Sequence, residues 1–153
     1  MRQDARERLG RVGAVLSFAL FSLLFFGTAV TFSGPLERSV AGSWHLLDEV
    51  SGKGCRLELR TAVHPAAVSA PAFRVDAGNC RGVLPGAADI AAWKALPEGG
   101  LLLVSGAGDT VAAFDVGELD GLISVAPSGV FLLLTPEHPM ALSALIPAAS
   151  PRM

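Results

Sequence analysis

The sequence predicts an all-β domain, either a closed barrel or a sandwich, that follows an apolar N-terminal segment. After residue 40, short apolar runs are separated by turn residues roughly every 8–12 positions. Within residues 55–60 (CRLELR), apolar and charged side chains alternate strictly, as they do in a half-buried antiparallel strand. Only residues 89–96 have the spacing of a convincing helix in this part of the chain.

Residues 12–32 (VGAVLSFALFSLLFFGTAVTF) form a run of 21 residues without a single charged side chain. A helix of this length spans about 30 Å, which is the thickness of the hydrocarbon core of a bilayer. Four arginines and two acidic residues precede the run. Because positive charge holds the preceding end in the cytoplasm, the sequence predicts that the chain after Phe32 is exported.

The apolar run is either a retained membrane anchor or a cleaved signal peptide. Gly27-Thr28-Ala29 offers a cleavage site of the small-x-small type, and the apolar stretch before it is at the upper limit of length for a signal. The apolar character continues through Phe32, as it does in an anchor. Both alternatives place the following domain in the periplasm, either free or attached to the inner membrane.

The exported part, residues 34–153, is long enough for one domain and carries 8 basic and 12 acidic residues. It has no cluster of Lys and Arg to bind a phosphate backbone, so no nucleic-acid partner is expected. We expect a monomer. Its predicted parts are an Arg-rich region with the apolar helix (1–33), an extended link (34–40), the β domain (41–146) and a flexible tail (147–153).

Cys55 and Cys80 are the two cysteines of the chain. An even count on the exported side favours a disulfide, which would close a loop of about 25 residues. The alternatives are free thiols or a metal pair. Two cysteines this far apart, without a nearby His or a second pair, make a poor zinc site.

In chain order, residues 33–40 (SGPLERSV) contain a Gly-Pro pair that predicts an extended or turning path rather than a helix. Residues 41–48 predict a strand beginning at Gly42, and this strand forms a hairpin with residues 55–60. An irregular connection with two prolines then leads to a short strand at 72–76.

Residues 89–96 (DIAAWKAL) predict a helix, with Asp89 as its cap and Pro97 as its stop. Strands are predicted at 100–105, 110–115, 122–125 and 130–135, with a hairpin turn at 106–109. The tail offers one further edge strand near residues 142–146. Trp44 and Trp93 are interpreted as core or lid residues.

The sequence disfavours an enzyme. His45, His64 and His138 lie far apart, and the chain has no HExxH, GxSxG, P-loop or dinucleotide-binding motif. The Gly106-Ala107-Gly108 segment joins two predicted strands with no helix after it, so it indicates a turn rather than a nucleotide loop. We expect no metal and no cofactor.

Several motifs, in order along the chain, resemble the bacterial AprI/Inh family of metalloprotease inhibitors. They are Ala41-Gly42-Ser43-Trp44, the pair Cys55 and Cys80, Trp93 before a turn containing proline, residues 100–103 (GLLL) and residues 108–114 (GDTVAAF). Each motif is weak alone, and the ordered set covers about 75 residues. The resemblance implies a small up-and-down β-barrel of about eight strands with one disulfide, located in the periplasm.

The resemblance also implies a mechanism. Members of the family block secreted zinc proteases of the serralysin type by inserting the extended segment ahead of the barrel into the active-site cleft. In this chain the corresponding residues are Ser33, Gly34, Pro35, Leu36 and Glu37. The N-terminus can approach the zinc of the protease only if the chain is cleaved just before this segment. If the apolar helix is retained, the expected alternative is a membrane-tethered barrel that binds another envelope component or a small apolar ligand.

Overall fold

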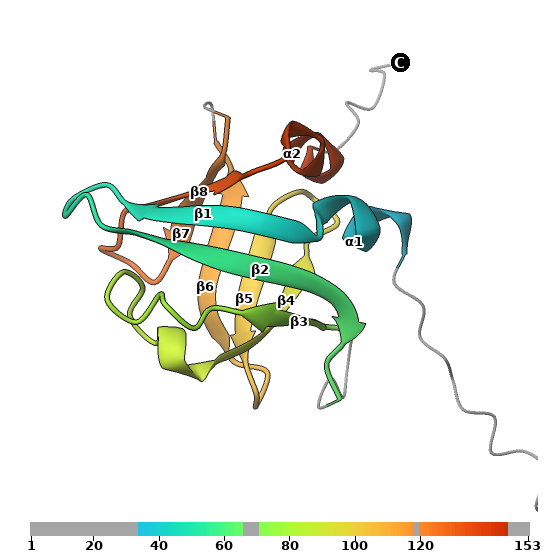
Figure 1. Cartoon of the computed structure of the whole chain (residues 1–153), viewed down its shortest axis with the longest axis horizontal. Coiled ribbons are helices and arrows are strands. Elements are labelled where there is room, and N and C mark those ends of the chain that lie inside the picture. The colour runs from blue at the N-terminus through green and yellow to red at the C-terminus, as the bar shows by residue number, and fades with distance from the viewer. Residues whose placement is uncertain (1–33, 66–70, 118–119, 147–153) are drawn as a thin grey trace, which may run out of the picture. The chain divides into compact units, whose positions relative to one another are not determined.

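The computed structural model describes residues 34–65, 71–117 and 120–146. In these residues eight strands follow one another in a single sheet, each antiparallel to the next (Figure 1). They are β1 (Gly42–Asp48), β2 (Gly54–Val63), β3 (Phe73–Asp76), β4 (Ile90–Ala95), β5 (Leu101–Ser105), β6 (Thr110–Val116), β7 (Leu122–Ala126) and β8 (Leu132–Pro136). Because β1 also pairs with β8, the sheet closes into an up-and-down barrel and not a sandwich.

The alternation of side chains explains the first hairpin. Trp44 faces Leu57 across the β1–β2 ladder, and both side chains point into the barrel and are fully buried. Arg56 and Glu58, between the inward positions of β2, point outward. The hairpin predicted from residues 41–48 and 55–60 is therefore confirmed, and β2 continues three residues beyond the predicted end to Val63.

The predicted strands of the C-terminal half are confirmed within two residues at each end as β5, β6, β7 and β8. The turn predicted at 106–109 joins β5 to β6. Its Ser105 amide donates to the Asp109 carbonyl over 2.8 Å, and Gly108 has a φ of 93°. Glycine adopts this left-handed conformation at little cost, so the sequence marks this turn clearly.

The helix predicted at 89–96 is wrong. A single 3-10 turn spans Ala87–Asp89, and the chain then continues as β4. Trp93 pairs with Phe73 of β3 on one side and with Leu103 of β5 on the other. An isolated two-turn helix gains little stability by itself, whereas a strand at this position completes the hydrogen-bond ladders of two neighbours.

Two short helices, α1 (Pro35–Val40) and α2 (Pro139–Leu145), contact each other at one end of the barrel, which we call the helix end (Figure 1). Both correct the sequence-based prediction, which gave an extended path at 34–40 and an edge strand near 142–146. In each case a proline occupies the first turn of the helix. Proline is tolerated there because the first N–H groups of a helix have no partner within it.

The opposite end, which we call the disulfide end, is covered by the connection between β3 and β4. Cys80, Leu84 and Ala87 of this connection are buried against the core. Cys55 and Cys80 form the predicted disulfide, with their Cα atoms 5.2 Å apart, and it fastens the connection to β2. The disulfide prediction is confirmed.

One continuous core fills the barrel. Its largest fully buried side chains come from β1, β2, β4, β5, β6, β7, β8 and the disulfide-end connection: Trp44, Leu46, Leu57, Leu59, Leu84, Trp93, Leu101, Leu103, Phe114, Leu122, Leu132 and Leu134. Trp44 and Trp93 are both core residues, so the interpretation as core is confirmed and the lid role is wrong. Within the described part of the chain, the interior is occupied by side chains and both ends are covered.

Candidate functional site

The segment ahead of β1 is held against the barrel by its own helix. Gly34, in extended conformation (φ −67°, ψ 174°), is the N-cap residue of α1, and Pro35 follows as the first helical residue. Val40, the last residue of α1, is fully buried in the core, and Leu36 packs against the same core from a half-buried position. The helix is therefore a docked part of the barrel and not a free arm.

Trp44 fixes the end of α1 from inside the barrel. Its indole Nε1–H donates to the carbonyl oxygen of Val40 over 2.9 Å, and both residues are fully buried. The amide of Ala41 also donates to the carbonyl of Glu37 over 2.9 Å, which closes the last turn. These bonds satisfy carbonyl groups that would otherwise be left without partners at the end of a helix.

The five residues predicted to contact a protease do not form one extended stretch. Ser33 lies outside the described residues. Gly34 is extended, whereas Pro35, Leu36 and Glu37 belong to α1. Leu36 contacts the core and so is not free to fill a pocket of a partner, as an extended arm would allow. Any segment that extends freely from the barrel therefore ends at Gly34.

The second helix forms the other part of the helix end. Two of its residues, Ala141 and Leu145, lie four apart on one face and are buried against the barrel. The side chain of Met140 in α2 is 76% exposed, and that of Ile146, which caps the end of the helix, is 50% exposed. The sequence analysis missed this helix. The spacing of Ala141 and Leu145 after Pro139 is the signal that could have identified it.

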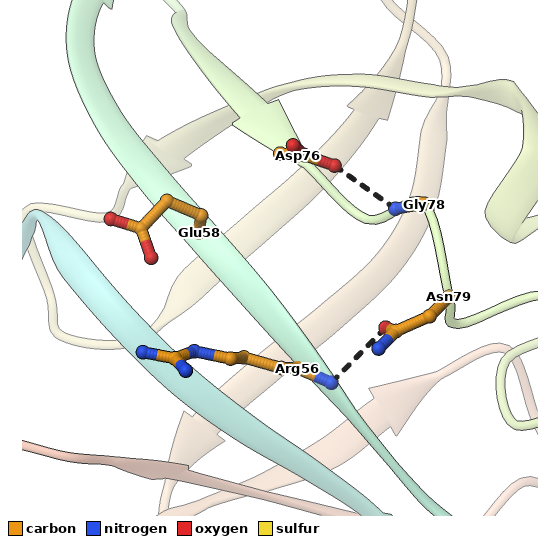
Figure 2. Close-up of a pocket in the computed structure, with 5 residues that line it drawn as sticks. All are labelled: Arg56, Glu58, Asp76, Gly78 and Asn79. Atoms are coloured by element: carbon orange, nitrogen blue, oxygen red, sulfur yellow. Dashed lines mark hydrogen bonds between the residues drawn. The ribbon is translucent and has the colours of Figure 1, made fainter.

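A shallow hollow of about 310 Å³ lies on the outer surface between β2 and the start of the disulfide-end connection (Figure 2). Arg56, Glu58, Asp76, Gly78 and Asn79 line it. Two internal hydrogen bonds bind the hollow together: the Arg56 amide donates to Oδ1 of Asn79 (3.3 Å), and the Gly78 amide donates to Oδ1 of Asp76 (3.1 Å).

The charges near this hollow are partnered within the chain. The guanidinium of Arg56 donates to Oγ of Ser43 over 2.7 Å and pairs with the carboxylate of Glu137 at 3.0 Å. The Ser43 hydroxyl in turn donates to Glu58 over 2.6 Å. All of these groups are at least partly exposed to solvent, so the arrangement is that of a surface network between strands β1, β2 and β8.

Among the residues that the structure describes, the three histidines lie on separate parts of the fold, and no metal-binding cluster is formed. His45 lies on the outer face of β1, His64 follows β2, and His138 precedes α2. In the described ranges, no three side chains of His, Cys, Asp or Glu are close enough to share a metal ion.

Residues 12–32, the predicted signal or anchor helix, lie outside the described residues, as do the tail residues 147–153. Neither helix of the described part is long and apolar enough to cross a bilayer.

No protein-family model matches the chain, and no curated protein matches it. Among solved structures, the chain is similar to one described as the crystal structure of a psychrophilic marine protease MP inhibitor. The two share 18% sequence identity with a TM-score of 0.49, and the likeness covers 65% of this chain and 96% of that one. Similarity at this level does not by itself assign a function to the chain.

Proposed function

We propose that the chain is an exported protein inhibitor of a secreted zinc metalloprotease of the serralysin type. Its proposed active part is the short segment that ends at Gly34, which enters the active-site cleft of the protease. The proposal rests on the ordered motifs that resemble the AprI/Inh family, together with the position of this segment directly ahead of a docked helix.

The family-like motifs occupy positions in the fold that suit such an inhibitor. Trp44 of β1 lies in the core of the barrel, and Cys55 and Cys80 form a disulfide. Trp93 is buried in β4, and residues 108–114 form the β5–β6 turn and most of β6. The resulting closed barrel with one disulfide is the fold that the resemblance implies.

The observation that carries the proposal is the docking of α1 onto the barrel. Buried Val40 and its hydrogen bond to Trp44 fix the helix that immediately follows the candidate segment. A segment held at its base by a rigid barrel loses little conformational entropy when it binds, so more of its contact energy is available for affinity. The zinc belongs to the protease, and a neutral amine or a carbonyl at the free end of the segment would replace its bound water.

Export is part of the proposal. A disulfide such as Cys55–Cys80 forms and persists in oxidising compartments, which supports a periplasmic location. Release of the segment requires cleavage between about residues 29 and 34, and the small residues Gly27-Thr28-Ala29 provide a suitable site.

The test compares two chains, one beginning at residue 30 and one beginning at residue 34, which keeps Gly34 as the cap of α1. Both retain α1 and every core residue named above, so both keep the closed core. We expect the longer chain to inhibit a serralysin-type protease stoichiometrically. The shorter chain should bind at least about 100-fold more weakly and melt at nearly the same temperature. Equal inhibition by both chains would refute the role of the segment.

The alternative function is a membrane-tethered barrel without inhibitory activity. It is favoured by the uninterrupted apolar run that ends only two residues before Gly34. In that case the N-terminus stays in the cytoplasm and cannot enter a cleft. A small apolar ligand inside the barrel is not favoured, because the side chains of the core fill it.

A further inference from the structure

The partner that binds the candidate segment must lie next to the helix end of the barrel. Residues 30–34 span at most about 18 Å even when fully extended. They lead directly into α1, and α1 contacts α2 (Figure 1). Whatever holds these residues is therefore close to the outer surface of α2.

That outer surface is apolar and uncharged. The stretch from Pro139 to Ile146 contains no charged residue, although a short helix on the surface of a small barrel normally exposes polar side chains. Met140 is 76% exposed and Ile146 is 50% exposed, and Ser143 is exposed between them along the chain. The surface is also ordered before binding, because Ala141 and Leu145 hold α2 on the core.

We propose that the outer surface of α2 is a second contact with the protease, beside the cleft that receives the segment; this rests on the proposed function. Interface cores are depleted in charged residues and enriched in methionine, which is the composition of this surface. The matching region of the protease is an apolar, uncharged rim of the cleft. The contact adds affinity without a large ordering cost, because both elements at the helix end are already docked.

Two other exposed apolar side chains lie at the opposite end of the barrel from this contact. Val50 is 78% exposed in the β1–β2 turn, and Phe131 is 60% exposed just before β8. The Glu49 amide donates to the Phe131 carbonyl over 3.0 Å, so these two connections lie together at the disulfide end. Val50 therefore provides a matched control, equally apolar and exposed but at the far end of the barrel.

The test uses the chain beginning at residue 30 and a serralysin-type zinc protease that it inhibits. The variants are Met140→Asp, the double variant Met140→Asp/Ile146→Asp, and the control Val50→Asp. Inhibition constants are measured, and melting temperatures verify folding. We expect Met140→Asp to raise the inhibition constant about tenfold and the double variant to raise it further, mainly through faster dissociation. Val50→Asp should leave it unchanged.

Three outcomes would overturn the inference. If the parent chain inhibits but Met140→Asp has no effect, the second contact is absent and the proposed function stands. If the parent chain itself does not inhibit, the proposed function fails and this inference fails with it. A lipid bilayer is the alternative partner for the outer surface of α2. If Met140→Asp leaves inhibition intact but weakens flotation of the chain beginning at residue 30 with phosphatidylethanolamine–phosphatidylglycerol vesicles, α2 faces the membrane instead.

Discussion

At the scale of single residues, the two tryptophans connect the core to the backbone around it. Trp93 donates its indole N–H to the carbonyl of Arg60 over 2.9 Å, as Trp44 does to that of Val40. Each side chain therefore fills the barrel and also satisfies a carbonyl group. For Trp44 this carbonyl belongs to α1, the helix that precedes the barrel, so one core residue holds the end of that helix.

Replacing Trp44 with Phe should lower the free energy of unfolding by about 1–3 kcal/mol, because the buried Val40 carbonyl loses its donor. Denaturant unfolding measures this loss. Amide exchange of Ala41, which bonds to Glu37 in the last turn of α1, should accelerate more than exchange in β5. Equal acceleration in both elements would show that Trp44 stabilises only the core.

Gly100 lies at the helix end with a φ of 92°, and a Cβ there would collide with the carbonyl oxygen of Phe114. Gly100→Ala should therefore cost at least about 3 kcal/mol of unfolding free energy, from the left-handed backbone and the collision together. Gly108 is the matched control, because its φ is 93° but a Cβ would meet no atom within 4 Å. Gly108→Ala should cost only about 1 kcal/mol. Similar costs at both sites would refute the collision.

The carboxylate of Asp48 accepts hydrogen bonds in the β1–β2 turn, so the stability of this turn depends on pH. The Ser51 hydroxyl donates to its carboxylate over 2.6 Å and the Val50 amide over 3.0 Å, and these bonds lower the pKa of Asp48 from its ordinary 3.8. Because the folded pKa is the lower one, the stabilisation is present above 3.8 and disappears as the pH falls through the folded value.

Ser51→Ala should therefore move the pKa of Asp48 upward, because the largest cause of its shift is removed. An NMR titration of the Asp48 carboxyl carbon measures the shift, and the exposed carboxyl of Asp115, which Ser51 does not contact, serves as the reference. An unchanged pKa for Asp48 in the variant would show that the Ser51 hydrogen bond is not formed in solution.

At the scale of elements, alternation and turn residues predicted the strands well. In β2 the charged residues Arg56 and Glu58 alternate with the apolar residues Cys55, Leu57 and Leu59. This pattern indicates a strand with one solvent-exposed face, as every long strand of a small closed barrel has. Such local patterns do not determine which strands close the sheet. The β1–β8 pairing joins residues about 90 positions apart, and only the family resemblance indicated it beforehand.

Some elements were predicted wrongly because tertiary packing overrides the local sequence pattern at those positions. Ile90 and Trp93 have the spacing of a helix face. As a strand, however, β4 forms backbone hydrogen bonds with both β3 and β5. Pro35 was interpreted as disfavouring a helix, and residues 142–146 were interpreted as an edge strand, although Pro35 and Pro139 both begin helices. This second error also shifted the candidate site, because residues 35–37 were expected in the free segment and are docked in α1.

The disulfide stabilises the barrel through the connection that covers one of its ends. Replacing Cys55 and Cys80 with Ala should reduce the unfolding free energy by about 3 kcal/mol, as expected for a closed loop of 25 residues. Urea unfolding of the variant and the oxidised parent measures the difference. Amides of residues 80–89 should also exchange faster, whereas those of α1, at the opposite end, should change little. Loss of α1 protection would show that the two ends are coupled.

At the scale of the whole molecule, the barrel is a closed and filled support with different elements at its two ends. The disulfide end is held by a covalent bond, and the helix end carries α1, α2 and the point where the candidate segment ends. We propose that the helix end alone recognises the protease. The family resemblance predicted the segment, and the fold shows that α2 contacts α1, the helix that follows it.

The account also predicts how inhibition depends on pH. If the freed α-amino group binds the zinc, it must be neutral, and its pKa is ordinarily about 7.7–8.0. Inhibition should then strengthen as the pH rises through this range. An acetylated N-terminus, made on the chain beginning at residue 30, should abolish this dependence. A flat pH profile for the unmodified chain would indicate that a carbonyl, and not the amine, approaches the zinc.

The central claim is that a segment freed just ahead of α1 is the working part of the protein. The most direct measurement is the intact mass and N-terminal sequence of the protein recovered from the cell envelope. The account predicts a chain that begins between Val30 and Gly34, with the segment released from the membrane. A full-length chain beginning at Met1 would contradict it and leave a tethered barrel whose N-terminus cannot reach a protease zinc.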